Sequence, residues 1–131
     1  VGSEMCIRDR AEIGSGSGMA AGAICYIKGG DTDQIGHACA MALKNLMGLV
    51  CDPVGGLVEV PCVKRNVGGA VNALAAADMA LAGITSKVPV DQVIDAMKEV
   101  GDKMDVSLRE TGVGGVAGTP AAQEVVEKLG M

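Results

Sequence analysis

The chain has 131 residues, a net charge of −5 and a pI of about 4.7, and 49% of its residues are hydrophobic although it has no Phe or Trp. Nucleic acid and anionic membrane surfaces attract basic proteins, so we expect neither as a partner. No apolar run reaches the roughly 18 residues of a membrane span, because Lys28 and Lys44 interrupt the best candidates. Five cysteines in an acidic chain without an apolar leader favour reduced thiols and a cytoplasmic location.

The first ten residues differ from the rest of the chain. Residues 1–10 are charged and patternless, and they run into a helical segment without a cap. They also resemble the translation of a sequencing adapter. We therefore expect a non-native tail at 1–10 and exclude it from the fold prediction.

Helical patterns follow in chain order and predict an all-α fold. Ser15 or Ser17 is the expected cap of the first helix, and Cys25 and Cys39 are expected in the core. Lone His37 is expected to be structural. Val93, Ile94, Met97 and Val100 should face inward from a helix that Asp91 caps, and Thr119-Pro120 should open the last one. The predicted helices are 17–27, 34–47 after a start at 31–33, 64 or 66 to 82, 91–104 and 121–129.

Residues 48–66 interrupt these helices and hold the most informative motif. Cys51 and Cys62 are eleven residues apart, and each lies close to a proline. We expect an ordered loop here because glycines and prolines surround the Val-rich run 57–60. Neither zinc sites nor most ferredoxin clusters use such a gap, so the spacing alone favours two buried apolar cysteines over metal ligands.

The complete string gives a more specific indication. It reads Cys51-Asp52-Pro53-Val54-Gly55-Gly56-Leu57-Val58-Glu59-Val60-Pro61-Cys62-Val63-Lys64-Arg65-Asn66. It resembles the cluster-binding signature C-D-P-V-x-G-L-V-x-x-P-C-x-x-R-N of the iron–sulfur L-serine dehydratases, and every fixed position is present. Residues 109–115 match a shorter segment of that family, R-E-T-x-x-G-G, and residues 11–21 resemble a third.

This resemblance covers residues 11–131 and implies the C-terminal half of a catalytic α chain, with an all-α fold and a Gly/Pro-rich cluster-binding loop. Such an enzyme converts L-serine to pyruvate and ammonia with a 4Fe–4S cluster and without pyridoxal phosphate, and the α chain acts with a β chain. By the resemblance, Cys51 and Cys62 are two of three cluster ligands. The third cysteine falls at the position of Asp9, so we expect the 131-residue chain by itself to be inactive.

The remaining roles stay open between alternatives. Arg65 either binds the substrate or neutralises the cluster loop. Asn66 either binds the substrate or caps the next helix. Ser15 and Ser17 are weaker candidates for the pocket. The general base is unknown, since Asp52 is expected to brace a turn and Glu59 to face solvent.

Two other functions remain possible on this sequence. An L-cysteine desulfidase of the same superfamily would use the same cluster on another substrate. A helical module that binds a partner through its surface, with inert buried cysteines, would need no iron. Glycine-rich residues 14–18 also allow an anion site at a helix end, although a plain helix-entry turn is the commoner explanation.

Overall fold

The computed structural model describes residues 11–57 and 59–130, and over these ranges the chain forms helices and no strand. The predicted all-α fold is therefore confirmed, whereas the predicted tail 1–10 lies outside the described residues. None of the helices described is long and apolar enough to cross a membrane. The α-helices are α2 (Ala11–Ile27), α3 (Thr32–Leu46), α4 (Cys62–Leu81), α5 (Val90–Lys103) and α6 (Pro120–Leu129), and the short 3-10 helices are η1 (Val54–Gly56), η2 (Val106–Leu108) and η3 (Gly115–Gly118).

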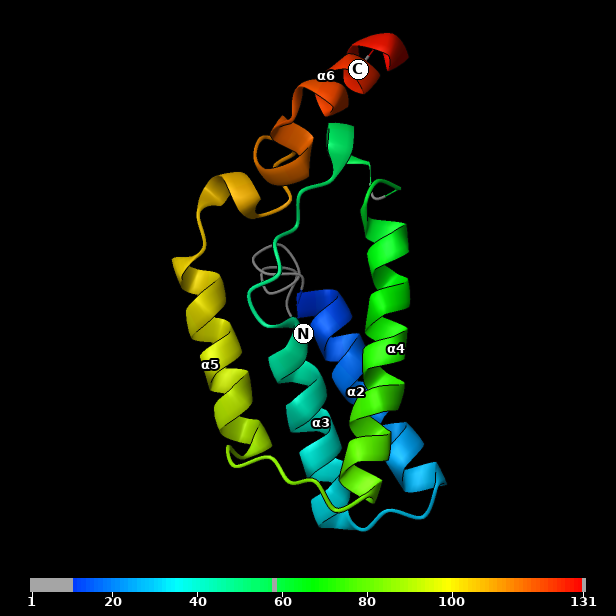
Figure 1. Ribbon diagram of the computed structural model, residues 1–131. Coiled ribbons are helices and arrows are strands. Elements are labelled where there is room, and N and C mark those ends of the chain that lie inside the picture. Colours follow the sequence, from blue (N-terminus) through cyan, green and yellow to red (C-terminus); the bar gives the residue numbers. More distant parts are fainter. Residues whose placement is uncertain (1–10, 58, 131) are drawn as a thin grey trace.

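Helices α2, α3 and α4 pack against one another along their lengths, and α5 lies against α3 (Figure 1). Helix α6 lies at the far end of the molecule, against η1 and η3. Small side chains fill the three-helix core, which lets the helix axes approach closely. The buried members of this core are Ala21, Cys25, Ala38, Met41, Ala42, Ala73, Ala76, Ala77 and Ala80.

Two glycines of α2, Gly18 in its glycine-rich start and Gly22 one turn later, lie close against α3. A Cβ on Gly18 would meet Leu43 at 3.1 Å, and one on Gly22 would meet the Cys39 Sγ at 2.7 Å. Glycine weakens a helix by up to about 1 kcal/mol, yet here it allows contact with α3 that outweighs the propensity. The predicted start of this helix was therefore too late. Ser15 and Ser17 lie within α2 and are not its caps, and residues 14–18 are not a helix end.

The predicted start of α3 is confirmed. The Asp31 carboxylate accepts from the Gln34 backbone N–H at 2.8 Å, and the Gln34 side chain accepts from the Asp31 N–H at 3.0 Å. This reciprocal pair is a capping box, which satisfies two backbone donors at the helix end. His37 on this helix accepts from the Ser86 N–H at 3.3 Å, in keeping with a structural role.

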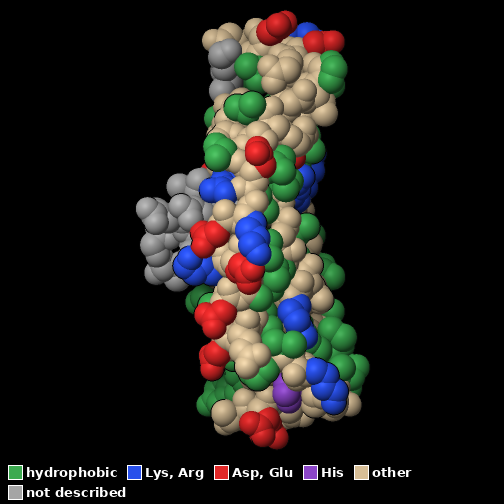
Figure 2. All heavy atoms as spheres, turned by 90° about the vertical axis from the view of Figure 1, so that its left-hand side faces the viewer, with side chains coloured by type: hydrophobic (Ala, Val, Ile, Leu, Met, Phe, Trp, Pro, Cys, Tyr) green, Lys and Arg blue, Asp and Glu red, His purple; other side chains and the backbone are tan. Residues whose placement is uncertain are grey.

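Helix α5 is amphipathic, and its details correct two predictions. Pro89 occupies the cap position and Asp91 lies in the first turn, so Asp91 is not the cap. Val93 and Met97 are buried, but Ile94 is exposed, at a cavity that residues of α2, α3 and α5 line. The ion pairs Lys98–Asp102 and Lys103–Glu99 lie along its outer face, where Figure 2 shows basic and acidic side chains mixed.

One polar network joins the three bundle helices. The Ser17 hydroxyl on α2 is buried and donates to the Gly69 carbonyl of α4 at 2.8 Å. The Asn72 side-chain amide donates to the Ser17 Oγ and to the Ala42 carbonyl of α3, each at 2.9 Å. Its Oδ1 accepts from Asn45 at 2.8 Å. Asn72 therefore connects α4 to both neighbours.

We predict that Asn72→Ala lowers the free energy of unfolding by about 2 kcal/mol, because it removes the donor to the buried Ser17 hydroxyl and the side-chain bond to the Ala42 carbonyl. Urea unfolding followed by circular dichroism measures the change. Asn66→Ala is the matched control, since Asn66 is exposed on the same helix, and it should cost less than about 0.5 kcal/mol. Equal losses in the two variants would contradict the role of the network.

Candidate functional site

The loop between Cys51 and Cys62 closes on itself. The Val54 N–H donates to the Val60 carbonyl at 2.9 Å, and η1 forms the turn between them. The predicted ordered loop is thus confirmed over its described residues, which include no strand. Cys51 precedes this closed neck and Cys62 follows it as the first residue of α4, and both are buried.

A second segment lies alongside Cys51. The Cys51 N–H donates to the Leu108 carbonyl at 3.0 Å, and the Glu110 N–H donates to the Cys51 carbonyl at 2.6 Å. These two bonds form an isolated bridge between Cys51 and Arg109. The structure therefore places the two family-like segments, 51–66 and 109–115, side by side.

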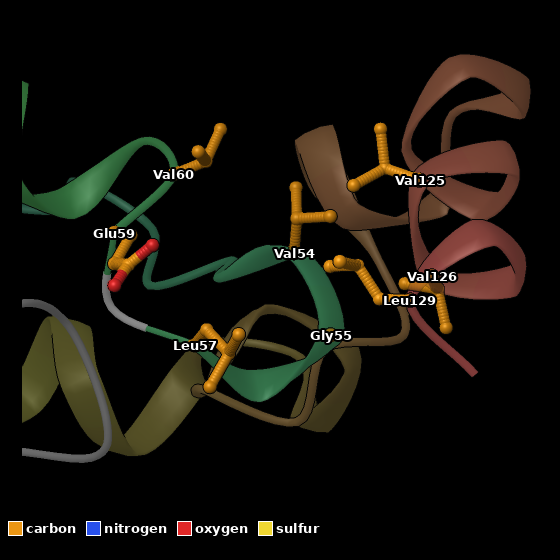
Figure 3. A pocket seen from close by; sticks show the side chains of 8 residues that line it. All are labelled: Val54, Gly55, Leu57, Glu59, Val60, Val125, Val126 and Leu129. Atoms are coloured by element: carbon orange, nitrogen blue, oxygen red, sulfur yellow. The ribbon is translucent and has the colours of Figure 1, made fainter. Parts of the chain in front are cut away.

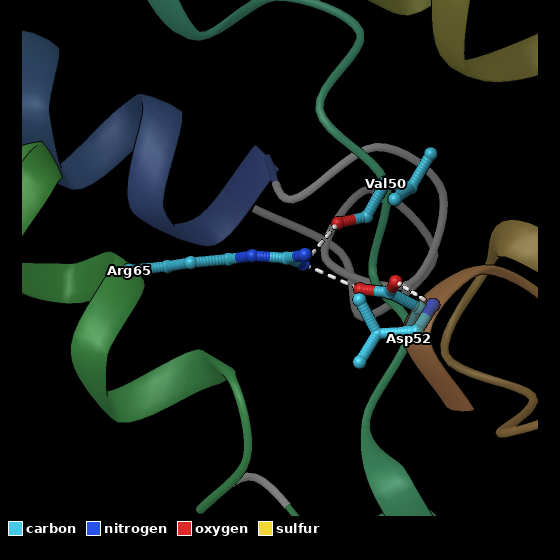
Figure 4. A network of polar contacts seen from close by, with 4 residues as sticks. Val50, Asp52 and Arg65 are labelled. Atoms are coloured by element: carbon cyan, nitrogen blue, oxygen red, sulfur yellow. Dashed lines mark hydrogen bonds and ion pairs between the residues drawn. The ribbon is translucent and has the colours of Figure 1, made fainter. Parts of the chain in front are cut away.

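Asp52 joins these segments to the start of α4. Its carboxylate is 1% exposed, pairs with the Arg65 guanidinium through Oδ1, and accepts from the Val116 N–H through Oδ2 at 2.6 Å (Figure 4). The same Arg65 nitrogen donates to the Val50 carbonyl at 3.2 Å. Arg65 thus binds the residues on either side of Cys51.

This contact joins the two segments that carry the cysteines. Cys62 and Arg65 are three residues apart in α4, and residues at that spacing share one face of a helix. Because Arg65 reaches residues 50 and 52, the first turn of α4 is held against the chain at Cys51. The N-terminus of α4 also carries a partial positive charge, which favours an anionic group beside Cys62.

Two glycines permit the close approach of segment 109–115. Gly115 has a φ of +62°, and a Cβ there would overlap the Asp52 carboxylate. Gly112 has a φ of +68°, and its Cβ would meet the Pro53 carbonyl at 3.4 Å. Any larger residue at Gly115 would therefore be strained and would displace Asp52.

Arg109 anchors the same segment to α5. Its Nε donates to the Met104 carbonyl at 2.6 Å, and its Nη2 donates to the Asp102 carbonyl at 3.0 Å. Carbonyls at a helix C-terminus lack partners within the helix, so a guanidinium there both satisfies and neutralises them. Two fixed positions of the R-E-T-x-x-G-G pattern, Arg109 and Gly115, thus have structural contacts that account for them.

The predicted substrate-binding residues line separate cavities. Asn66 and Ser17 line one cavity of about 210 Å³, Arg65 lines another of about 300 Å³, and Ser15 lines a largely apolar one of about 300 Å³ against α3 and α5. Of the alternatives left open, Arg65 neutralises the loop through Asp52, and Asn66 is not a helix cap because α4 begins four residues earlier.

Glu59 is exposed, as predicted, and lies at the edge of a small cavity of about 130 Å³ between the loop and α6 (Figure 3). The other lining residues are apolar or glycine, among them Val54 and Leu57 of the loop and Val125 of α6. Asp52 has a wider role than the predicted turn brace, because its partners lie on α4 and at η3.

Cys25 and Cys39 lie away from the loop, in the contacts among α2, α3 and α4. Burial, followed by the nearby Asp31 charge, raises the pKa of the Cys25 thiol. Burial also raises the pKa of Cys39, against a smaller opposing effect of the Gly22 backbone N–H. Both cysteines are therefore held as neutral thiols. The predicted core position is confirmed for Cys25, which is buried, whereas Cys39 is only half-buried.

The site defines a helical protein with two cysteines held by a rigid polar framework. Thiolates are the usual protein ligands of iron–sulfur clusters. A helix N-terminus and an adjacent guanidinium suit the negative charge of such a group, so the residues present fit it. Within the residues that the structure describes, no group of three His, Cys, Asp or Glu side chains is arranged to hold a metal ion, and the predicted third position, Asp9, lies outside them.

Comparison with known proteins agrees with this description. The sequence profile of the family described as "Serine dehydratase alpha chain" matches residues 9–117. The chain is 61% identical over 120 residues to "Probable L-serine dehydratase, alpha chain" of Bacillus subtilis (strain 168), which covers 92% of the chain and 40% of that protein. It is 61% identical over 111 residues to the protein of that name in Latilactobacillus sakei, covering 85% and 53%.

A third relative, "L-serine dehydratase, alpha chain" of Peptoniphilus asaccharolyticus, is 50% identical over 116 residues, covering 88% of the chain and 40% of that protein. The chain belongs to the serine dehydratase alpha chain family. It spans about half or less of the length of these curated relatives. The non-native origin of residues 1–10 stays a prediction.

We predict that Asp52→Asn lowers the free energy of unfolding by about 1–3 kcal/mol, because a buried charge-assisted bond is lost. The loss should be below that of a fully buried pair, since the Arg65 side chain is 31% exposed and screened by water. Urea unfolding of the intact α chain measures it.

The exposed pair Lys28–Asp78 provides the control. Asp78→Asn makes the same chemical change on the surface of α4 and should cost less than about 1 kcal/mol. If both variants lost the same stability, Asp52 would have no special place in the framework.

Proposed function

We propose that this chain is part of the α chain of an iron–sulfur L-serine dehydratase, a lyase that forms pyruvate and ammonia from L-serine. The observation that carries the proposal is the framework around Asp52, which joins the segment at Cys51 to the first turn of α4, where Cys62 lies, in a chain of this family. The names of the relatives support the substrate and, through the words "alpha chain", a β chain as partner. The cysteine content and acidic charge favour a cytoplasmic enzyme.

Cys51 and Cys62 would supply two of the three thiolates that hold a 4Fe–4S cluster, with a third cysteine at the position of Asp9. Such a group supplies a Lewis acid that polarises the β-hydroxyl of serine, so that no pyridoxal phosphate is required. The chain's own residues hold the ligands still: Arg65 fixes the backbone on both sides of Cys51, and Asp52 fixes Arg65. Preorganised ligands lose less entropy when the cluster binds.

The structural contacts also bear on substrate binding. Arg65 donates to Asp52 and Val50, which assigns at least part of its guanidinium to the framework. Asn66 is exposed one turn from Cys62 and shares a cavity with Ser17. Ser17 already donates to Gly69 within the bundle. Asn66 is therefore the better candidate for a polar contact to the substrate.

An L-cysteine desulfidase is the second candidate, because a cluster of the same kind can polarise a C–S bond. The relatives named L-serine dehydratase favour the serine enzyme. A helical module without iron is the third candidate. Iron bound to the complete enzyme would exclude it, and an enzyme without iron would support it.

We predict that the complete α chain, assembled with its β chain and reconstituted with iron and sulfide without oxygen, releases pyruvate from L-serine faster than from L-cysteine. Each substrate is assayed at several concentrations, so that kcat/KM is compared rather than one rate. The 131-residue chain by itself should release none, because it lacks the third ligand.

Faster turnover of L-cysteine would replace the proposal with the desulfidase. A complete enzyme that binds no iron and shows no broad absorbance near 400 nm, a region typical of iron–sulfur clusters, would support the non-catalytic module. Turnover by the 131-residue chain alone would contradict the expected need for a third ligand.

We predict that Cys51→Ala in the complete enzyme abolishes the bound cluster and the turnover together, because a thiolate ligand is removed. Iron and sulfide analysis with the visible spectrum measures the cluster independently of activity. Cys25→Ala is the matched control: it also removes a buried thiol, and it should retain the iron content at some cost in stability. A Cys51→Ala enzyme with a full cluster would refute the ligand assignment.

A further inference from the structure

Helix α4 carries a row of aliphatic side chains on the face opposite its packed side. The spacing of four, four and three residues keeps them in one line along the helix. Each is between 49% and 65% exposed, in a helix whose other face packs on α2 and α3. We call this row the α4 stripe; its members are Val63, Val67, Val71 and Leu74.

The remaining surface of α4 is also poor in charge. No charged residue lies between Arg65 and Asp78, and Ala70 and Ala75 extend the apolar surface beside the stripe. A helix on the outside of a protein normally shows a charged face, as α5 does with its paired Lys, Asp and Glu side chains. A helix that is apolar on all sides is normally buried on all sides. The composition of α4 is thus that of a central helix.

The length of the relatives indicates what covers the stripe. The chain corresponds to 40% of the Bacillus subtilis relative and 53% of the Latilactobacillus sakei relative, so about half or more of each α chain lies outside the 131 residues. A polypeptide of that size supplies enough helices to surround α4.

The chemistry of the stripe resembles that of a domain interior. Interfaces between separately folded proteins are enriched in aromatic residues, Met and Arg. The stripe contains only Val and Leu, which are among the residues most often fully buried in domain interiors.

We propose that the α4 stripe is covered by an apolar segment of the same α chain that lies outside these 131 residues, which makes α4 the central helix of the complete domain. The inference concerns the assembly of the domain and does not depend on the substrate or on iron.

Cysteine labelling of the complete α chain tests this proposal. Single variants Val67→Cys and Val71→Cys are treated with a maleimide, and mass spectrometry of the peptide that carries each new thiol gives its labelling rate. Each rate is divided by the rate for the same variant in guanidinium. Lys98→Cys is the exposed control, since Lys98 is 67% exposed and Val67 is 65% exposed. Val93→Cys is the buried control, because Val93 is 1% exposed. The labelling rates of the other variants are compared under conditions in which the Val93→Cys thiol is protected from the maleimide.

We expect both stripe thiols to react at least about tenfold more slowly in the folded α chain without its β chain than in guanidinium, because a covered thiol reacts only when the structure opens. Lys98→Cys should react at nearly the same rate in both. Protection that appears only after the β chain is added would show that the partner covers the stripe and would overturn the proposal. Protection that rises with α-chain concentration would indicate a second copy, and full reactivity throughout would indicate an exposed face; either result would also overturn it.

Discussion

The buried carboxylate of Asp52 is the constraint on which the arrangement of the site depends. It is the point where three parts of the chain meet: the loop that carries Cys51, the first turn of α4 that carries Cys62, and the turn at η3. A carboxylate out of contact with water must have its charge and lone pairs satisfied, so its two partners are held in fixed directions. The network therefore joins the two segments that carry the cysteines, since Cys51 is next to Asp52 and Cys62 is three residues before Arg65.

The three-helix bundle provides the rigid support for this network. Gly18 and Gly22 bring α2 close to α3, and Asn72 joins α4 to both by hydrogen bonds. The alanine-rich packing among the three helices leaves little room for α4 to slide or turn. Arg65 therefore projects from a helix that the bundle already holds in place. Its hydrogen bonds can then fix the position of the chain at Cys51.

Some features were predictable because the signal is local. A capping box needs only Asp31 and Gln34 three residues apart, and the ordered loop follows from prolines and glycines around residues 51–62. The start of α2 was missed because local propensity argues against glycine in a helix, while the contacts that compensate are made with Leu43 and Cys39 on another helix. The cap role of Asn66 failed for a related reason: α4 begins at Cys62, directly after the closed loop.

The sequence by itself determined the helical fold class, the two cysteines that define the candidate site and the resemblance to iron–sulfur serine dehydratases, because periodicity and motif spacing are properties of neighbouring residues. Only the tertiary structure decided that Asp52, Arg65 and the Val116 N–H form one buried network, and that Gly115 must lack a side chain to allow it. These partners are up to 64 residues apart in the chain. Burying the Asp52 carboxylate costs free energy unless its charge is paired, and these contacts offset that cost. The carboxylate becomes buried only after the helices have packed, so the sequence alone does not show the need for partners.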